Sequence, residues 1–424
     1  MRIAIIGTGI AGNVAAWKLR DEHDITVFEA GSYVGGHTNT IDVEEDGKVL
    51  PVDTGFIVFN EHTYPNFIQL LEELGQASKP SNMSFSVHSE DGRVEYASAS
   101  LNGLFSQRRN LLRPSHYRML RDVLRFFRDA VADVQRYGRQ QTIGEYLRSR
   151  NYSKEFVDDY LVPMTAAIWS AEPVAVLDMP ALFLVRFFKN HGLLQLKDRP
   201  QWRVIEGGSR EYVRKLVAGH AERVRLNSPV QSIERLQDGV AITSATAGRE
   251  IYDFVFIACH SDQALGLLAD PTPAEEAVLG AIAYQPNEAV LHTDTSLLPI
   301  RKRAWSSWNY LVPSDPRKHV TVSYNMNILQ GLDARQTYVV TLNDDGRIDP
   351  DKVIRKVEYE HPVYTLETIA AQQRHAEINC DRTFYCGAYW RNGFHEDGVV
   401  SALNAVAHFE ERLAHAELHL RRAS

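Results

Sequence analysis

The clearest structural pattern in the chain lies at residues 2–29, RIAIIGTGIAGNVAAWKLRDEHDITVFE. It opens with an apolar, β-branched run at residues 3–6 and passes through a glycine-rich turn into a helix-compatible segment at 13–19. A second strand-forming run, DITVFE, closes it at 24–29. A strand, a helix and another strand in so short a stretch form a βαβ unit, which predicts a parallel sheet covered by helices.

The turn inside this unit is a G-x-G-x-x-G motif formed by Gly7, Gly9 and Gly12. Gly7 permits a tight turn, Gly9 lets the backbone approach a pyrophosphate, and Gly12 lets the helix pack on the strand. The helix N-terminus stabilises the phosphate charge, and Glu29 at the end of the second strand is placed to accept hydrogen bonds from ribose hydroxyls. The motif therefore predicts a dinucleotide site, against the alternative of an ordinary strand-to-helix turn.

Length and composition indicate the number of domains and exclude some partners and cellular locations. The chain has 424 residues and a formal net charge of −8, and its length suggests about two or three domains. The acidic balance argues against nucleic acid as a partner, because proteins that bind it usually carry a basic excess. Three cysteines are too few for a disulfide framework, which favours a cytoplasmic protein. No apolar run is long enough to span a bilayer, so we expect any membrane contact to be peripheral, on the inner face.

The rest of the chain predicts a mixed fold. An Asp91-Gly92 pair between residues 83–88 and 93–96 predicts a hairpin. Residues 101–190 form a helical insert, with helices expected at 117–137, 142–150, 153–160 and 181–189. Three segments at 224–259, VRLNSPVQSIERL, GVAIT and DFVFIAC, predict an antiparallel meander. Residues 384–413 predict a strand, a glycine turn and a closing helix.

Residues 29–38, EAGSYVGGHT, resemble the extended fingerprint of the flavin amine oxidase superfamily, which includes protoporphyrinogen oxidases, monoamine oxidases and carotenoid desaturases. In that superfamily an arginine usually follows the paired glycine, and here the position is His37. The resemblance implies FAD as the cofactor. An imidazole at this position can donate a hydrogen bond where the arginine would place a charge.

Further segments extend the resemblance over nearly the whole chain: VDTGF at 52–56, EGGSREY at 206–212, NSPV at 227–230, FYCGA at 384–388 and EDGVVSA at 396–402. The cofactor-binding residues implied by the motif and the resemblance are Gly7, Gly9, Ile10, Ala11, Gly12, Glu29, Ala30, Gly35, Gly36, His37, Thr38, Thr54, Gly55, Phe56, Val230, Gly387, Asp397, Gly398 and Val399. The implied fold is a Rossmann-like α/β domain, with a doubly wound parallel sheet and a meander, built from residues 1–80, 200–280 and 375–424. An α+β substrate domain would comprise residues 81–199 and 281–374.

A narrower resemblance points toward lipid. AWSSWNYL at 304–311, SYNMNILQGL at 323–332, VVTLN at 339–343, the His361-Pro362 pair and CGAYWRNGFHEDG at 386–398 resemble a bacterial family of FAD-binding oxidoreductases. Members of that family are associated with cyclopropane-fatty-acid-synthase-like methyltransferases. The resemblance implies a lipid or acyl-chain substrate, a methyltransferase as pathway partner, and desaturation of a methyl-branched fatty acyl chain on the route to furan fatty acids.

A basic segment also favours contact with lipid. Residues 104–128, LFSQRRNLLRPSHYRMLRDVLRFFR, carry seven arginines against one aspartate, Asp122, with leucines and phenylalanines between them. A basic amphipathic helix can lie in a membrane interface with its cations near anionic headgroups. It can equally pack its apolar face on the core and leave the arginines in water.

FAD accepts a hydride from a substrate C–H bond, so no metal is required and the site is expected to have aromatic walls. The aromatic candidates are Trp169, Trp305, Trp308, Tyr324, Tyr389, Trp390 and Phe394, with Tyr389 and Trp390 favoured as catalytic residues because they lie between two cofactor motifs. For proton transfer the candidates are His395, Glu396 and His361. Two alternatives remain: oxidation of a small or aliphatic amine, and a non-catalytic lipid-binding protein stabilised by FAD.

Overall fold

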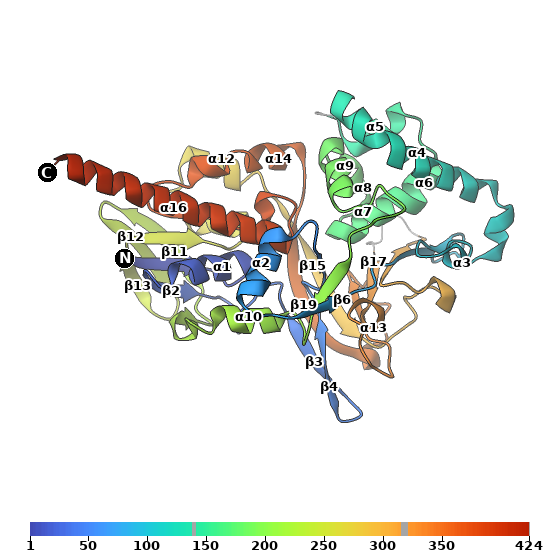
Figure 1. Cartoon of the computed structure of the whole chain (residues 1–424), viewed down its shortest axis with the longest axis horizontal. Coiled ribbons are helices and arrows are strands. Elements are labelled where there is room, and N and C mark those ends of the chain that lie inside the picture. The colour runs from blue at the N-terminus through green and yellow to red at the C-terminus, as the bar shows by residue number, and fades with distance from the viewer. Residues whose placement is uncertain (138–140, 315–320, 424) are drawn as a thin grey trace.

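A five-stranded parallel sheet, in the order β10-β2-β1-β14-β20, carries the glycine turn. The computed structural model that shows it describes residues 1–137, 141–314 and 321–423. The strands are β1 (Arg2–Ile6), β2 (Asp24–Phe28), β10 (Val224–Arg225), β14 (Phe254–Ile257) and β20 (Thr383–Tyr385). Helices α1 (Ile10–Leu19), α10 (Arg210–Val217) and α16 (His395–Ala423) lie beside this sheet (Figure 1). The predicted α/β fold is confirmed.

The antiparallel meander differs from the sequence prediction at both ends, because Val224–Arg225, the start of the first predicted segment, forms β10 of the parallel sheet. It consists of β11 (Val230–Leu236), β12 (Gly239–Ser244) and β13 (Gly248–Tyr252). The DFVFIAC segment was expected to be its last strand, and this is wrong: its core becomes β14 and pairs in parallel with β1. All four residues of β14 are buried, and a strand covered on both faces belongs in the centre of a parallel sheet.

A seven-stranded sheet forms the second half of the molecule, in the order β19-β15-β18-β17-β16-β7-β8. Its strands are β7 (Phe85–Ser89), β8 (Glu95–Ala97), β15 (Tyr284–His292), β16 (Trp308–Val312), β17 (Thr321–Asn325), β18 (Val339–Leu342) and β19 (Val353–Pro362). The predicted hairpin at Asp91-Gly92 is the antiparallel pair of β7 and β8, and Gly92 has φ +66° as such a turn requires. The long strands β15 and β19 lie between the two halves of the molecule (Figure 1).

The helical insert covers one end of the second half (Figure 1). It contains α3 (Leu101–Leu104), η1 (Arg108–Leu112), α4 (Pro114–Tyr137), α5 (Ile143–Ser149), α6 (Lys154–Phe156), η2 (Val157–Leu161), α7 (Val162–Trp169), α8 (Pro173–Asp178) and α9 (Ala181–Asn190). Along α4, Met119, Val123 and Phe126 are buried in the core. Much of the apolar face of this basic helix is therefore used in packing.

The remaining elements are two small sheets and several short helices. Two small sheets comprise β3 (Thr40–Glu45) with β4 (Lys48–Asp53), and β5 (Phe59–Asn60), β9 (Trp202–Ile205) and β6 (Ser78–Pro80). The remaining helices are α2 (Pro65–Glu73), η3 (Ala221–Arg223), α11 (Ser261–Leu267), α12 (Pro273–Leu279), η4 (Lys302–Ala304), α13 (Met326–Leu329), η5 (Pro350–Lys352), α14 (Leu366–Gln372), α15 (His375–Ile378) and η6 (Ala388–Trp390). Within the described ranges, every helix is too short or too polar to cross a bilayer.

Candidate active site

The glycine turn has the close packing that its sequence predicts. A Cβ on Gly12 would lie 2.0 Å from the carbonyl oxygen of Gly7, so only glycine lets α1 start this close to β1. At Gly9 an added Cβ would meet nothing within 4 Å, and no side chain caps the helix there. The N-terminus of α1 therefore faces open space with free N–H groups, which is a suitable place for phosphate.

Glu29 lies directly after β2, beside the same turn. Its carboxylate accepts hydrogen bonds from the backbone N–H of Thr8 at 3.0 Å and of Gly31 at 2.7 Å, and from the Thr8 hydroxyl. These donors fix the carboxylate at the end of the parallel sheet, where the fold places nucleotide ribose.

The paired glycines bring a third backbone segment to the turn. Gly35 and Gly36 have φ +136° and +57°, and a Cβ on Gly36 would lie 3.1 Å from the Cα of Gly9. The backbone N–H of Phe56 donates to the carbonyl of His37 at 2.7 Å, and a Cβ on Gly55 would lie 2.2 Å from that same oxygen. The segments at 35–37 and 54–56 thus pack together as one wall.

A cavity of about 710 Å³ extends from this turn into the second half of the molecule. The predicted cofactor residues that line it are Gly7, Gly9, Ile10, Ala11, Glu29, Ala30, Gly35, Gly36, His37, Thr54, Gly55, Phe56, Val230 and Gly387. Gly12, Thr38, Asp397, Gly398 and Val399 lie behind this lining. A Cβ on Gly398 would lie 2.5 Å from Cγ2 of Ile10, so this glycine lets α16 approach α1.

The far end of the cavity is apolar and aromatic. Ile168, Trp169, Trp308, Tyr324, Leu329 and Leu342 line it, with Phe394 closer to the C-terminal motif. Trp308 and Tyr324 meet edge to face at 5.1 Å between ring centroids, and the indole nitrogen of Trp308 has no partner in the structure. Trp305 is not part of this lining, and its indole N–H donates to the carbonyl of Pro299 at 2.7 Å.

His395 lies in the lining, in a fully occupied hydrogen-bond environment. Its Nε2 is 2.9 Å from the Tyr212 hydroxyl and 3.0 Å from the Thr38 hydroxyl, and its ring stacks on Phe56. Burial lowers the pKa of His395 to about 3. The imidazole is therefore neutral at physiological pH and can exchange hydrogen bonds without carrying a charge.

The two acidic residues after His395 face away from the cavity. Glu396 accepts from the backbone N–H of Phe67 at 2.9 Å and from the side chain of Asn66 at 2.6 Å, so it caps α2. Asp397 accepts from the backbone N–H groups of Phe394 and Asn392, at 3.0 and 3.2 Å. Burial raises the pKa of Asp397 to about 6. Both carboxylates hold the turn and α16 in place.

The two aromatic residues favoured as catalytic, Tyr389 and Trp390, lie in different environments. Tyr389 lines the cavity, and its buried hydroxyl has no partner in the structure. Trp390 is outside the lining and stacks on His375 at 4.1 Å between ring centroids. Adjacent residues of a short turn point to different sides, and the sequence did not distinguish them.

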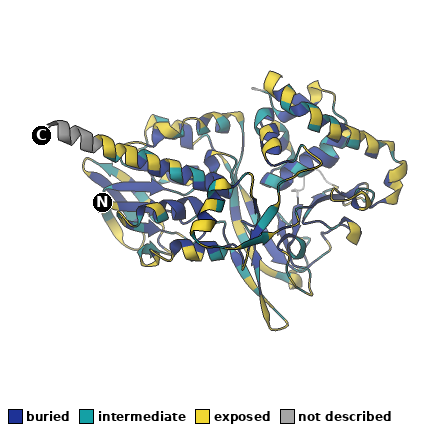
Figure 2. Ribbon diagram, in the orientation of Figure 1, coloured by how far each residue is buried: buried dark blue, intermediate teal, exposed yellow. Residues whose placement is uncertain are grey.

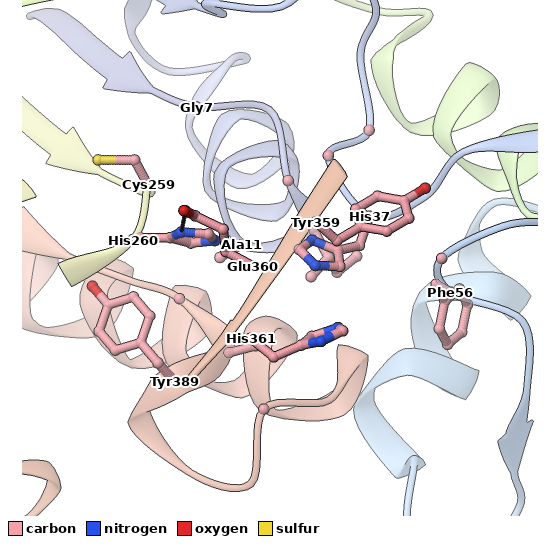
Figure 3. A pocket seen from close by; sticks show the side chains of 18 of the residues that line it. Gly7, Ala11, His37, Phe56, Cys259, His260, Tyr359, Glu360, His361 and Tyr389 are labelled. Carbon is pink, nitrogen blue, oxygen red and sulfur yellow. Dashed lines mark hydrogen bonds and ion pairs between the residues drawn. The ribbon is translucent and has the colours of Figure 1, made fainter. Parts of the chain in front are cut away.

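Sequence reasoning missed part of the cavity wall. His260 and Tyr359 line it together with His37 and His361 (Figure 3). His37 stacks on Tyr359 at 4.8 Å, and its ring centroid lies 5.4 Å from that of His361. A usable signal existed for His260, because it closely follows a buried parallel strand, and ligands bind at the carboxyl ends of such strands.

The residues present fit FAD. The open helix N-terminus and Glu29 suit the pyrophosphate and a ribose, and Val230 lies in the wall near them. The apolar far end suits a planar ring system. Within the described part of the chain, the buried nitrogen His37 Nε2 and the Tyr389 hydroxyl lack partners, and both residues line the cavity. A bound ligand with polar groups along its length would satisfy such atoms.

Comparison with known proteins places the chain in a family. Residues 10–325 match the family described as flavin containing amine oxidoreductase. The chain belongs to this family of flavin-dependent oxidoreductases, and FAD is its cofactor. Over 287 residues it is 28% identical to a protein of Mycobacterium tuberculosis assigned as flavin-containing monoamine oxidase AofH, covering 63% of this chain and 59% of that relative. The match thus spans less than two thirds of the relative's length.

Solved structures show the same fold. A protein from Exiguobacterium sp. 255-15, assigned as a protoporphyrinogen oxidase, superposes with a TM-score of 0.69 at 18% identity, covering 97% of this chain and 99% of that one. A CLA-producing fatty acid isomerase from P. acnes superposes with a TM-score of 0.67 at 16% identity, covering 96% and 98%. At these identities the likeness is one of architecture.

Proposed function

We propose that this protein is an FAD-dependent oxidoreductase that dehydrogenates a lipid-like acyl substrate, namely a methyl-branched fatty acyl chain of a phospholipid. The observation that carries the proposal is the apolar far end of the cavity, where Ile168, Leu329 and Leu342 join the tryptophan and tyrosine rings. Such a wall contacts hydrocarbon well and leaves little to recognise a charged amine. The fatty acid isomerase with the same fold supports an acyl substrate by analogy.

The reaction removes two hydrogens from adjacent carbons and forms a C=C bond. When bound, FAD would supply the acceptor for one of them as a hydride, and the other would leave as a proton that ends on the reduced cofactor or in solvent; oxygen or another electron acceptor would later remove the two electrons. The apolar walls exclude water, and the neutral His395 holds its hydrogen bonds at Nε2 without placing a charge beside the hydrocarbon. A methyltransferase that introduces the methyl branch fits as the enzyme acting before this one.

A basic surface on the helical insert supports delivery from a membrane. Leu112 is 89% exposed and Leu101 76% exposed, with Leu111, Tyr117 and Leu124 also exposed. The side chains of Arg121 and Arg128 in α4 are each 73% exposed. Exposed residues recur along α4 (Figure 2). We propose that this surface contacts an anionic bilayer peripherally, since exposed leucines and arginines together suit a lipid interface.

Oxidation of an amine is the second candidate, and the similarity to AofH supports it. Anaerobic mixing separates the candidates, because only a substrate bleaches the visible absorbance of the bound flavin. We expect bleaching by branched acyl phospholipid and none by aliphatic amines. Bleaching by amines alone would favour amine oxidation, and bleaching by neither would favour a non-catalytic lipid-binding protein.

Mass spectrometry of membrane lipids from cells with and without the protein tests the substrate directly. We expect one lipid class to lose two hydrogens per acyl chain when the protein is present. Identical lipid profiles would contradict the proposal.

A further inference from the structure

The cavity contains an unusual set of charges for a pocket that binds FAD. Among the described residues that line it there is no lysine or arginine, while Glu29 and Glu360 are both acidic. The pyrophosphate of FAD is a dianion, and the helix N-terminus at Gly9 offers only a partial positive charge. The lining side chains that can take up a proton and become cationic are histidines: His37, His260, His361 and His395.

Three of these residues, His37, His260 and His361, lie close together and are called here the histidine cluster (Figure 3). The ring centroid of His37 lies 5.4 Å from that of His361 and 6.4 Å from that of His260. The fourth, His395, is separately engaged with Tyr212 and Thr38.

The backbone next to His37 and His260 packs against the glycine turn. His37 follows Gly36, and a Cβ on Gly36 would lie 3.1 Å from the Cα of Gly9. His260 follows Ala258 and Cys259, and a Cβ on Gly7 would lie 3.1 Å from the carbonyl oxygen of Ala258. Two members of the cluster therefore flank the turn at which phosphate is expected to bind.

Two ring nitrogens in the cluster lack partners. His37 Nε2 and His361 Nδ1 are buried and have no hydrogen-bond partner among the residues that the structure describes, whereas His260 Nδ1 lies 3.2 Å from the carboxylate of Glu360. A buried donor or acceptor without a partner is unfavourable, so these two nitrogens are available to a ligand. Since the Glu360 carboxylate would balance a charge on His260, the groups able to add uncompensated positive charge are His37 and His361.

The surroundings keep the cluster neutral when no anion is present. Burial, and then the neighbouring His361, His260 and His395, lower the pKa of His37 well below its ordinary value. Burial and His260 lower the pKa of His361 to about 4. Burial also lowers the pKa of His260, against Glu360 and Asp262, which favour its charged form. Titratable tyrosines also face the cluster: Tyr359 stacks on His37 and Tyr284 on His260, and the Cys259 thiol lies in the same lining.

We propose that the histidine cluster is a proton-dependent anion site, in which His37 and His361 take up protons as the FAD pyrophosphate binds. A dianion placed against the cluster supplies the counter-charge that its walls lack, and so favours the protonated rings. The cofactor affinity of this chain then depends on pH, where a permanent cation would make it independent of pH. The inference rests on FAD binding alone and stands apart from the proposed substrate.

Calorimetric titration of the flavin-stripped protein with FAD tests this. At a fixed pH near neutrality, titrations in buffers of different ionisation enthalpy report the protons taken up, and we expect net uptake. Between pH 6 and 8 we expect the Kd for FAD to rise by about tenfold per pH unit for each proton taken up. A Kd that is constant over this range, with no net uptake, would overturn the proposal.

Variants assign the effect to the cluster. We expect His37→Gln combined with His361→Asn to weaken FAD binding and abolish proton uptake, and His37→Arg to bind FAD with less pH dependence. His62→Gln, at an exposed histidine outside the cavity, is the matched control and should retain the wild-type pH profile. Circular dichroism verifies that each variant is folded. ADP-ribose should reproduce the pH dependence and adenosine should not, because only ADP-ribose carries a diester pyrophosphate like that of FAD. Uptake that persists in the double variant, or pH-dependent binding of adenosine, would refute the assignment.

Discussion

The imidazole of His395 lies face to face with the ring of Phe56, at 3.4 Å between centroids and 11° between planes. Phe56 belongs to the segment beside the paired glycines, and His395 begins α16. The stack therefore joins an N-terminal and a C-terminal cofactor motif, far apart in the sequence, in one wall of the cavity. It also excludes water from an imidazole whose hydrogen bonds run to Tyr212 and Thr38.

Neutrality of His395 predicts a specific dependence of stability on pH. Its pKa falls from 6.5 to about 3 on folding, so the unfolded chain binds the proton more readily. The contribution of His395 to stability is complete above pH 6.5 and is lost as the pH falls toward 3. In His395→Asn we expect the free energy of unfolding to fall less steeply between those limits, by up to about 1.4 kcal/mol per pH unit. Urea unfolding at a series of pH values measures this, and parallel curves for the two proteins would show that folding leaves the pKa of His395 unchanged.

Capping of α2 by Glu396 predicts a structural effect. In Glu396→Gln the amide accepts less strongly from Asn66 and Phe67, so we expect a loss of about 0.5–2 kcal/mol in the free energy of unfolding. The rate of flavin reduction by substrate should change by less than about threefold, since the carboxylate lies outside the cavity lining. Stopped-flow absorbance measures that rate. A fall of about a hundredfold or more, at unchanged stability, would instead make Glu396 the catalytic acid or base.

Site residues that act within one continuous segment could be predicted from the sequence. Contacts between segments that are far apart in the sequence could not. Gly7, Gly12 and Glu29 act within one βαβ unit, so their spacing fixes their roles. The contact between His37 and His361 depends on how strand β19 crosses the cavity, which no local pattern encodes. Likewise, DFVFIAC has the composition of a buried strand in either sheet, and only the pairing with β1 decides between them.

The apolar far end of the cavity predicts selectivity for hydrocarbon. Ile168→Glu places a carboxylate in that wall, and burying such a charge without a partner is strongly unfavourable. We expect acyl phospholipid to bleach the flavin at least about tenfold more slowly, a difference of about 1.4 kcal/mol, while FAD content stays at the wild-type level. Ile300→Glu, at a side chain that is 80% exposed, is the control and should behave as wild type. Equal rates in the two variants would place the substrate elsewhere.

Close packing at Gly12 predicts a loss of stability when a side chain is added there. The methyl group of Gly12→Ala would approach the Gly7 carbonyl to 2.0 Å, so α1 must shift away from β1. Overpacking of this kind costs about 1–3 kcal/mol, and thermal unfolding should show it. Gly266→Ala in α11 is the matched control, since its Cβ would meet nothing within 4 Å. An unchanged melting temperature in Gly12→Ala would show that the turn packs less tightly.

The most direct test of the account is the flavin content of Gly9→Asp. The new side chain enters open space, so the protein should fold, but its carboxylate lies where the FAD pyrophosphate is expected and repels it. We predict a folded wild-type protein that is yellow with one FAD per chain, and a folded Gly9→Asp protein that is colourless after the same reconstitution. A Gly9→Asp protein that retains its full complement of FAD would contradict the account.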